Sequence, residues 1–242
     1  MNIFVIGDIH GCVRELIFLH EKIFTYDKFN SKDDLLIYLG DYIDRGQKSK
    51  QVIDEIIKLK NNKIKIINLM GNHEEFMIDF YSNKINNIKK WLNFGADQTF
   101  KSYGIEIVEF IKNGFEDDII DNLRNTLLEK MGNNHIDFFN NLEISFSTNK
   151  YLFVHAGIDP LKNLSDQTQK DYLWSRSNDF FHKDFMSKKI IVHGHTPVEN
   201  ITNHPYRINV DTGCYFSGNL SCVCLSDTNE SRNFLNTLPI KN

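Results

Sequence analysis

The sequence predicts an α/β protein, because short apolar segments alternate with amphipathic ones along the first third of the chain. The first strand is expected at Asn2–Ile6, and the helix after it at Cys12–Phe24, where apolar residues recur at helical spacing. Further strands are expected at Asp34–Leu39 and Lys63–Met70, with an amphipathic helix over Ser49–Lys60 between them. This alternation is typical of the α/β class.

The middle of the chain is predicted to be mostly helical and polar. One helix should start within Glu74–Tyr81, and another should cover Asp117–Lys130 and end at Gly132 and Asn133. No composition shift marks a domain boundary. We therefore interpret residues 1–242 as a single domain with a helical insertion at about 82–141, a solvated lid that would shape a substrate cleft.

The last part of the sequence returns to strands. Leu142–Ser147 and Tyr151–His155 read as a hairpin around Thr148 and Asn149. Three more apolar runs follow and predict strands, at Lys189–His193, Ile208–Asp211 and Leu220–Leu225.

Composition excludes several classes of protein. The chain has 242 residues, and its 28 Lys and Arg against 32 Asp and Glu give a net charge of −4, whereas nucleic-acid binders usually carry a basic excess. Its 4 Cys include no CxxC pair, which argues against a disulfide framework. No window approaches the roughly 18 apolar residues of a membrane span, and the first residues lack the basic start of a signal peptide. We expect a cytoplasmic monomer that binds neither nucleic acid nor membrane.

The chemistry lies where the predicted strands end. Five apolar runs each stop at a glycine-containing loop that carries Asp, Asn or His, and strand ends in α/β sheets converge on one edge. Carboxylate and amide oxygens mixed with imidazoles suit Mn, Fe or Zn. The five loops are Gly7-Asp8-Ile9-His10-Gly11, Gly40-Asp41-Tyr42-Ile43-Asp44-Arg45-Gly46, Gly71-Asn72-His73-Glu74, His155-Ala156-Gly157 and His193-Gly194-His195-Thr196.

These five motifs, in this order, resemble the calcineurin-like metallophosphoesterases, and within them the PPP-type serine/threonine protein phosphatases of the bacterial and bacteriophage kind. The resemblance extends over nearly the whole chain and includes three further segments. It implies a four-layer α/β-β/α sandwich with two mixed sheets flanked by helices. The further segments are Trp91-Leu92-Asn93-Phe94-Gly95, Leu173-Trp174-Ser175-Arg176, and Asp211-Thr212-Gly213 with Gly218-Asn219-Leu220 after it.

The resemblance implies two divalent metal ions, with Mn²⁺ expected and Fe, Zn or Ni as alternatives. Asp8 and His10 would bind the first ion, and Asp41 would bridge both. The second ion would be bound by Asn72, His155 and His195. His193 stands two residues before His195 and remains a weaker candidate, with a structural role favoured.

The same resemblance implies direct attack on phosphorus by a hydroxide that bridges the two metals. His73 would protonate the leaving alkoxide as general acid, and Asp44 would hold its other ring nitrogen. Arg45 and Arg176 would bind phosphate oxygens through charge-assisted hydrogen bonds. Glu74 is expected to cap a helix or support His73.

Several functions fit this site. The first is hydrolysis of phosphoserine and phosphothreonine in proteins, with phosphotyrosine or small phosphoesters also accepted. The second is a dinucleoside polyphosphate hydrolase like the diadenosine tetraphosphatases, which commonly lack the acid at the position of Asp44. Three other classes fit the sequence less well. A non-catalytic scaffold would be expected to lack at least one metal ligand, and a metallonuclease would be expected to carry a basic excess. A cysteine-dependent phosphatase would need a Cys-x5-Arg motif, which the sequence lacks. Residues outside the motifs are expected to be structural: His20, His135, His182, His204, Cys222 and Cys224.

Overall fold

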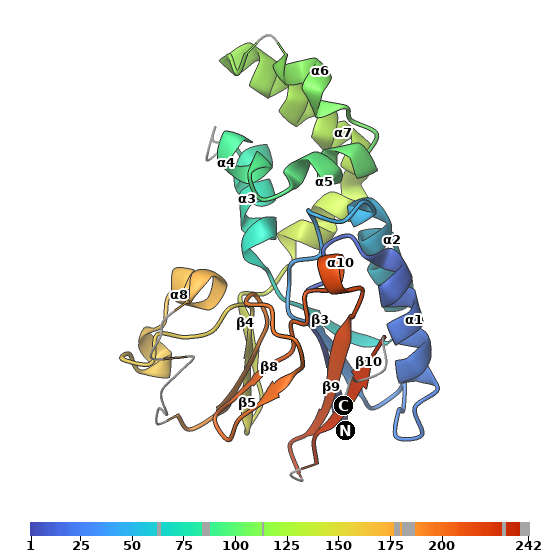
Figure 1. Cartoon of the computed structure of the whole chain (residues 1–242), viewed down its shortest axis with the longest axis vertical. Coiled ribbons are helices and arrows are strands. Elements are labelled where there is room, and N and C mark those ends of the chain that lie inside the picture. Colours follow the sequence, from blue (N-terminus) through green and yellow to red (C-terminus); the bar gives the residue numbers. More distant parts are fainter. Residues whose placement is uncertain are drawn as a thin grey trace.

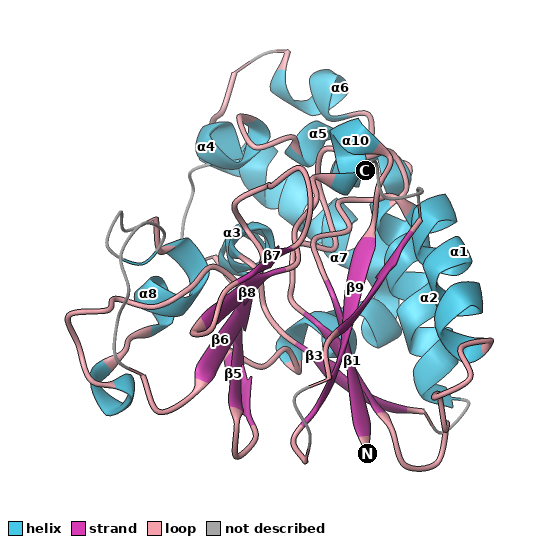
Figure 2. Cartoon of the chain, turned by 60° about the horizontal axis from the view of Figure 1, so that its bottom comes forward, coloured by secondary structure: helices cyan, strands magenta, loops and turns pink. Residues whose placement is uncertain are grey.

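The computed structural model describes residues 1–61, 64–83, 88–112, 114–176, 180, 187–228 and 231–237. Its strands form two five-stranded sheets that face each other, with helices on the outer side of each (Figures 1 and 2). This is the four-layer α/β-β/α sandwich that the sequence predicted.

The first sheet has the strand order β10-β9-β1-β2-β3. β1 (Asn2–Ile6), β2 (Leu35–Tyr38) and β3 (Lys65–Asn68) are parallel to one another. β9 (Ser221–Ser226) pairs antiparallel with β1, and β10 (Asn233–Asn236) extends the sheet beyond it. The first sheet is therefore mixed, and its three N-terminal strands end on the same edge.

The second sheet has the order β4-β5-β6-β8-β7. β5 (Tyr151–Val154), β6 (Ile190–His193) and β8 (Arg207–Asn209) are parallel. β4 (Ser145–Ser147) and β7 (Thr202–Asn203) pair antiparallel at its two edges. The predicted hairpin before residue 155 is thus confirmed, whereas β7 and β10 were not predicted from the sequence.

Three apolar clusters separate the layers. Between the sheets, Val5 and Ile37 from the first sheet belong to one buried cluster with Phe153 and Val192 from the second. On the outer face of the first sheet, α1 (Val13–Phe24) and α2 (Ser49–Asn61) cover a larger core (Figure 2). The outer face of the second sheet carries a smaller cluster: Leu152, Val154, Ile158, Phe180 and Ile191.

The middle of the chain is helical, as predicted. After α3 (Asn72–Tyr81) come α4 (Ile88–Leu92), α5 (Ala96–Ser102), α6 (Ile107–Ile111) and α7 (Asp117–Asn140), which extend from one end of the molecule (Figure 1). Further short helices in the described part of the chain include a 3₁₀ turn at Leu164–Asp166, α8 (Gln169–Trp174) and α10 (Cys214–Ser217). No helix in the part of the chain that the structure describes is long and apolar enough to cross a membrane.

The structure refines the expected picture of this region. Gly132 takes φ 65° and ψ 172° and breaks the helix where its end was predicted, and a second helical segment then continues as far as Asn140. The segment is also not simply a solvated surface, since Trp91, Phe100, Leu123 and Phe139 are all buried in the large core. These apolar residues are separated by many polar ones in the sequence. The sequence pattern therefore does not indicate that they pack together, and only the structure shows it.

Candidate metal centre and active site

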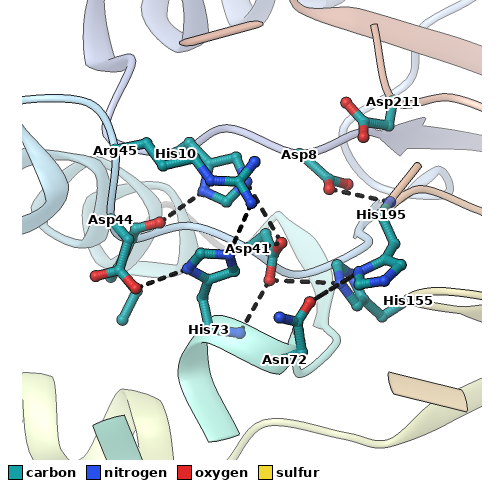
Figure 3. A network of polar contacts seen from close by, with 12 residues as sticks. Asp8, His10, Asp41, Asp44, Arg45, Asn72, His73, His155, His195 and Asp211 are labelled. Carbon is teal, nitrogen blue, oxygen red and sulfur yellow. Dashed lines mark hydrogen bonds and ion pairs between the residues drawn. The ribbon is translucent and has the colours of Figure 1, made fainter. Parts of the chain in front are cut away.

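The strand ends of both sheets meet and place the predicted site residues side by side (Figure 3). Asp8 follows β1, Asp41 follows β2 and Asn72 begins α3 after β3, while His155 and His195 follow β5 and β6. All five side chains are buried. Asp8 and His195 are 187 positions apart in the sequence, yet the backbone N–H of His195 donates to Oδ2 of Asp8 at 3.0 Å.

Asp41 occupies the middle of this cluster. Its Oδ2 lies 3.4 Å from Nε2 of His10, and its Oδ1 lies 3.4 Å from Nε2 of His155. The two carboxylate oxygens therefore face different histidines, as a carboxylate that spans two ions must. Burial alone would raise the pKa of Asp41, but the surrounding histidines together hold this pKa well below its usual range.

The second group of donors is equally close. Oδ1 of Asn72 lies 2.8 Å from Nδ1 of His195 and 2.9 Å from Nε2 of His155, and the two ring nitrogens are 3.1 Å apart. The other ring nitrogen of His155 lies 2.9 Å from the carbonyl oxygen of Leu39, which directs Nε2 into the cluster. His10 is oriented in the same manner through its Nδ1, 2.8 Å from a backbone carbonyl oxygen.

Charge and hydrogen bonding at this cluster fit divalent cations. Oδ1 of Asp8 is buried and has no hydrogen-bond partner. Burial, followed by the charges of Asp211 and Asp41, raises the pKa of Asp8 well above its usual value. Burial also raises the pKa of Asp211, to about 7. A cation at this cluster would supply the missing partner and relieve the repulsion among the three carboxylates.

The histidines are held in the form that binds metals. Burial lowers the pKa of His10 and of His155, although the charge of Asp41 opposes the effect. Burial also lowers the pKa of His195, to about 2. Neutral imidazoles are the species that coordinate metals. Asp8, His10, Asp41, Asn72, His155 and His195 therefore form a donor set that could hold two ions.

The backbone is strained at the same places. Among the described residues, six other than glycine have positive φ, and five of them are predicted site residues. Such conformations are costly for residues with a Cβ atom, and they cluster at functional sites. The five are His10, Asp41, Asp44, Arg45 and His195.

His73 and Asp44 form a buried pair beside the metal donors. Nδ1 of His73 lies 2.7 Å from Oδ2 of Asp44, and its Nε2 lies 3.8 Å from Oδ2 of Asp41. Burial would lower the pKa of His73, but the charge of Asp41 and the bond to Asp44 outweigh it and raise this pKa above its ordinary value. His73 is therefore suited to carry a proton near neutral pH.

Trp91 and Thr99 hold Asp44 in place, and sequence analysis gave neither residue this role. The Trp91 indole donates from Nε1 to Oδ2 of Asp44 at 2.7 Å, and the Thr99 hydroxyl donates to Oδ1 at 2.6 Å. Trp91 stood in a segment that resembles the family, whereas no pattern in the sequence distinguished Thr99.

Arg45 reaches the same pocket. Its Nη2 lies 3.2 Å from Nε2 of His73, and its guanidinium stands over the ring of Tyr215 at 4.8 Å. Its backbone N–H donates to the carbonyl oxygen of Gly95 at 3.1 Å. Gly95 has φ +94°, and a Cβ there would come within 2.9 Å of the Arg45 nitrogen, so this approach requires glycine.

Arg176 enters from the opposite side of the site. Its Nε donates to Nε2 of His195 at 3.1 Å, and its side chain is exposed. Trp174, two residues earlier, donates from its indole to Glu75 at 2.6 Å and packs edge-on against Phe76. These contacts fix the segment from which Arg176 extends.

Glu74 supports the loop of the bridging carboxylate. Its side chain accepts backbone N–H groups from Asp41 at 2.8 Å, Tyr42 at 2.9 Å and Gly71 at 2.9 Å. It is fully buried, and burial together with the charge of Asp41 raises its pKa to about 8. It thus caps the start of α3, as expected, and also fixes the backbone around Asp41.

The remaining histidines lie outside the donor set where they are described. The His193 ring packs against Phe180 with centroids 5.0 Å apart, on the outer face of the second sheet. His20 lies 2.8 Å from the Tyr38 hydroxyl, and His135 contacts Tyr103 and Asp54. His204 stacks on Tyr206, and His182 lies outside the described residues.

Curated relatives that span most of the chain include a tetraphosphatase and a protein phosphatase. The chain is 25% identical over 236 residues to the asymmetrical bis(5′-nucleosyl)-tetraphosphatase PrpE of Anoxybacillus flavithermus. This alignment covers 90% of the chain and 88% of the relative. The chain is 29% identical over 231 residues to serine/threonine-protein phosphatase 2 of Salmonella typhimurium, in an alignment that covers 91% of each.

A solved structure agrees with the fold. The cold-active protein-tyrosine phosphatase of a Shewanella species superposes with a TM-score of 0.57 at 16% identity, over 98% of this chain and 80% of that one. The family model described as calcineurin-like phosphoesterase matches residues 1–230. Because this match includes every strand end that builds the donor set, the chain belongs to the calcineurin-like phosphoesterase family.

Proposed function

We propose that the protein is a metal-dependent phosphatase that hydrolyses phosphoserine and phosphothreonine monoesters in proteins. The observation that carries this proposal is the His73–Asp44 pair, with 2.7 Å between Nδ1 and Oδ2. A serine or threonine alkoxide is a poor leaving group and must be protonated as it departs. A buried histidine with a raised pKa, held by a carboxylate, meets that need.

Four side chains beside the metal donors have separate roles in this proposal. Nε2 of His73 lies 3.8 Å from Oδ2 of Asp41 and would deliver the proton to the leaving oxygen once Arg45, now 3.2 Å from this nitrogen, has turned to the phosphate. Asp44 would hold the opposite nitrogen and stabilise the charged ring. Arg45 and Arg176, at the two sides of the site, would bind the phosphate oxygens and orient the ester.

The donor set Asp8, His10, Asp41, Asn72, His155 and His195 would hold two divalent ions, and we propose Mn²⁺. When bound, such ions supply Lewis acidity and an activated water molecule at neutral pH. Two divalent ions would add +4 formal charges and Arg45 and Arg176 a further +2, whereas Asp8, Asp41, Asp44 and Asp211 would contribute −4. The pocket would then be positive although the whole chain carries −4.

A second candidate is hydrolysis of dinucleoside tetraphosphates. It is favoured by PrpE relatives, among them four that match about nine tenths of the chain at 25–28% identity. A polyphosphate leaving group is far more acidic than an alkoxide and needs less protonation. The dedicated acid at His73 therefore favours phosphomonoesters over this alternative.

The two candidates are separated by one assay with Mn²⁺ and the full chain. A phosphoserine peptide, a phosphotyrosine peptide and diadenosine tetraphosphate are compared by kcat/KM. We expect the highest value for the phosphoserine peptide. A higher value for diadenosine tetraphosphate would overturn the proposal in favour of the second candidate.

A further inference from the structure

A second cluster of metal-binding side chains lies beside the catalytic donors and shares none of them. The sulfur atoms of Cys12 and Cys214 and a carboxylate oxygen of Glu15 lie within 4.8 Å of one another. Cys12 immediately precedes α1, Glu15 lies in its first turn, and Cys214 begins α10, some 200 residues later in the chain. Only tertiary folding brings the three together.

The chemistry of this cluster differs from that of the catalytic donors. The six catalytic donors are oxygens and imidazoles, which suit hard or borderline ions, whereas two thiols and a carboxylate select thiophilic ions such as Zn²⁺ and Cd²⁺. Ligand atoms around a tetrahedral Zn²⁺ stand roughly 3–4 Å apart, given metal–ligand distances of about 2.0–2.3 Å. Small side-chain rotations would therefore bring all three ligands onto one ion.

Access and charge also favour a cation at this position. Cys12 and Glu15 are partly exposed, while Cys214 is 2% exposed and anchors the inner side. All four cysteines are free thiols, and the thiol of Cys12 lies 3.6 Å from the backbone carbonyl oxygen of His10 and is hydrogen-bonded to the thiol of Cys214. An ion can thus enter from solvent, and water can complete its coordination.

We propose that Cys12, Glu15 and Cys214 form a third cation site, selective for a thiophilic divalent ion. The site borders the catalytic pocket, because Cys12 follows His10 by two residues and Tyr215 follows Cys214 directly. The Tyr215 ring contacts His10 at 5.5 Å and lies under the Arg45 guanidinium at 4.8 Å. An ion at this site would join the start of α1 to the segment on which Arg45 rests.

Cadmium titration of the full chain tests the proposal. The protein is saturated with Mn²⁺ and titrated with Cd²⁺ while the ultraviolet thiolate-to-cadmium charge-transfer band is recorded. Because the six catalytic donors include no cysteine, this band reports only thiolate ligands. We expect one Cd²⁺ per chain. Loss of a residue that merely supports a metal ligand typically weakens metal binding by roughly 10–100-fold. We therefore expect Cys12→Ser and Cys214→Ser, which remove a ligand itself, each to weaken Cd²⁺ binding by at least this factor.

Matched variants complete the test. Cys224→Ala removes a buried thiol on β9, and Glu21→Gln removes an exposed carboxylate from α1, so both should bind Cd²⁺ like the wild type, whereas Glu15→Gln should bind more weakly. If Cys214→Ser does not fold, Cd²⁺ protection of the Cys12 thiol from iodoacetamide in the wild-type chain replaces it. The proposal would be overturned if the wild type showed no band, if the band were unchanged in Cys12→Ser, or if the band were lost in Cys224→Ala.

Discussion

The hydroxyl of Thr99 binds both the backbone and the carboxylate of Asp44. It accepts the Asp44 backbone N–H at 2.8 Å and donates to Oδ1 at 2.6 Å. Asp44 has a positive φ of 69°, so this contact secures a strained residue at the point where its side chain must meet His73. Thr99 is therefore a positioning residue for the proposed general acid, located on a helix of the middle region.

Replacing Thr99 by valine should impair hydrolysis of phosphoserine more than hydrolysis of an ester with a good leaving group. Valine keeps the shape but leaves Oδ1 of Asp44 without its hydrogen-bond partner, at about 1–3 kcal/mol, whereas the Asp44 backbone N–H keeps the Ser49 hydroxyl at 3.2 Å. We expect kcat on a phosphoserine peptide to fall about tenfold and kcat on p-nitrophenyl phosphate to change little. Thr126→Val is the matched control, because that hydroxyl bonds only to a carbonyl of its own helix.

A double variant shows whether Thr99 acts through His73. In a His73→Asn background, Thr99→Val should cause no further loss on the phosphoserine peptide, since the acid is already gone. An additional tenfold loss in that background would mean that Thr99 acts on some other part of the site.

His73→Asn by itself should depend strongly on the leaving group. Loss of a general acid typically costs about 10²–10⁴-fold in rate, and we expect a loss of this size for the phosphoserine peptide. p-Nitrophenolate departs without protonation, so kcat on p-nitrophenyl phosphate should fall much less. Equal losses on both substrates would remove His73 from the acid role.

Asp41→Asn should abolish both metal binding and metal-dependent hydrolysis. Asp41 belongs to both groups of candidate ligands, one with His10 and the other with His155 and His195, and an amide has neither the charge nor the second oxygen ligand. Metal content by elemental analysis and turnover of p-nitrophenyl phosphate should fall together, while the exposed Asp97→Asn variant keeps both. Wild-type turnover in Asp41→Asn would contradict the proposed two-ion centre.

His135 should make stability depend on pH. Burial lowers its pKa below the ordinary 6.5, even though Asp54 lies 2.9 Å from Nε2. Above pH 6.5 the ring is neutral in both the folded and unfolded states. Below it the unfolded chain takes up a proton first, so the free energy of unfolding decreases as pH falls.

The His135→Gln variant removes this contribution. Urea midpoints measured at about pH 7 and pH 5 should differ less in His135→Gln than in the wild type. The slope that remains in His135→Gln is the sum of two opposing contributions. The lowered pKa values of His10, His155, His193 and His195 act in the same direction as that of His135, and the raised pKa values of Asp211 and Glu74 act in the opposite direction. An unchanged slope would show that His135 titrates alike in the folded and unfolded chain.

Sequence patterns predicted the strands well where they are central. β1 was predicted to the residue, and β2 and β6 within one residue at each end, because a strand buried on both faces has a continuous apolar sequence. β7 and β10 were missed. β7 has two residues, and β10 carries polar Asn233 and Asn236 at both ends, so neither has a local signature.

The sequence by itself determined the class of the fold and which side chains would meet, because chemically distinctive residues stand directly after apolar strands whose ends must converge. Tertiary structure alone decided how those side chains are held. Thr99 and Trp91 come from helices that read as a polar insertion, yet they fix Asp44, and Glu74 fixes the backbone of Asp41 from the next strand loop. These contacts join segments distant in the chain through a few hydrogen bonds each. Such bonds leave no periodicity in a sequence, so only the packed molecule reveals them.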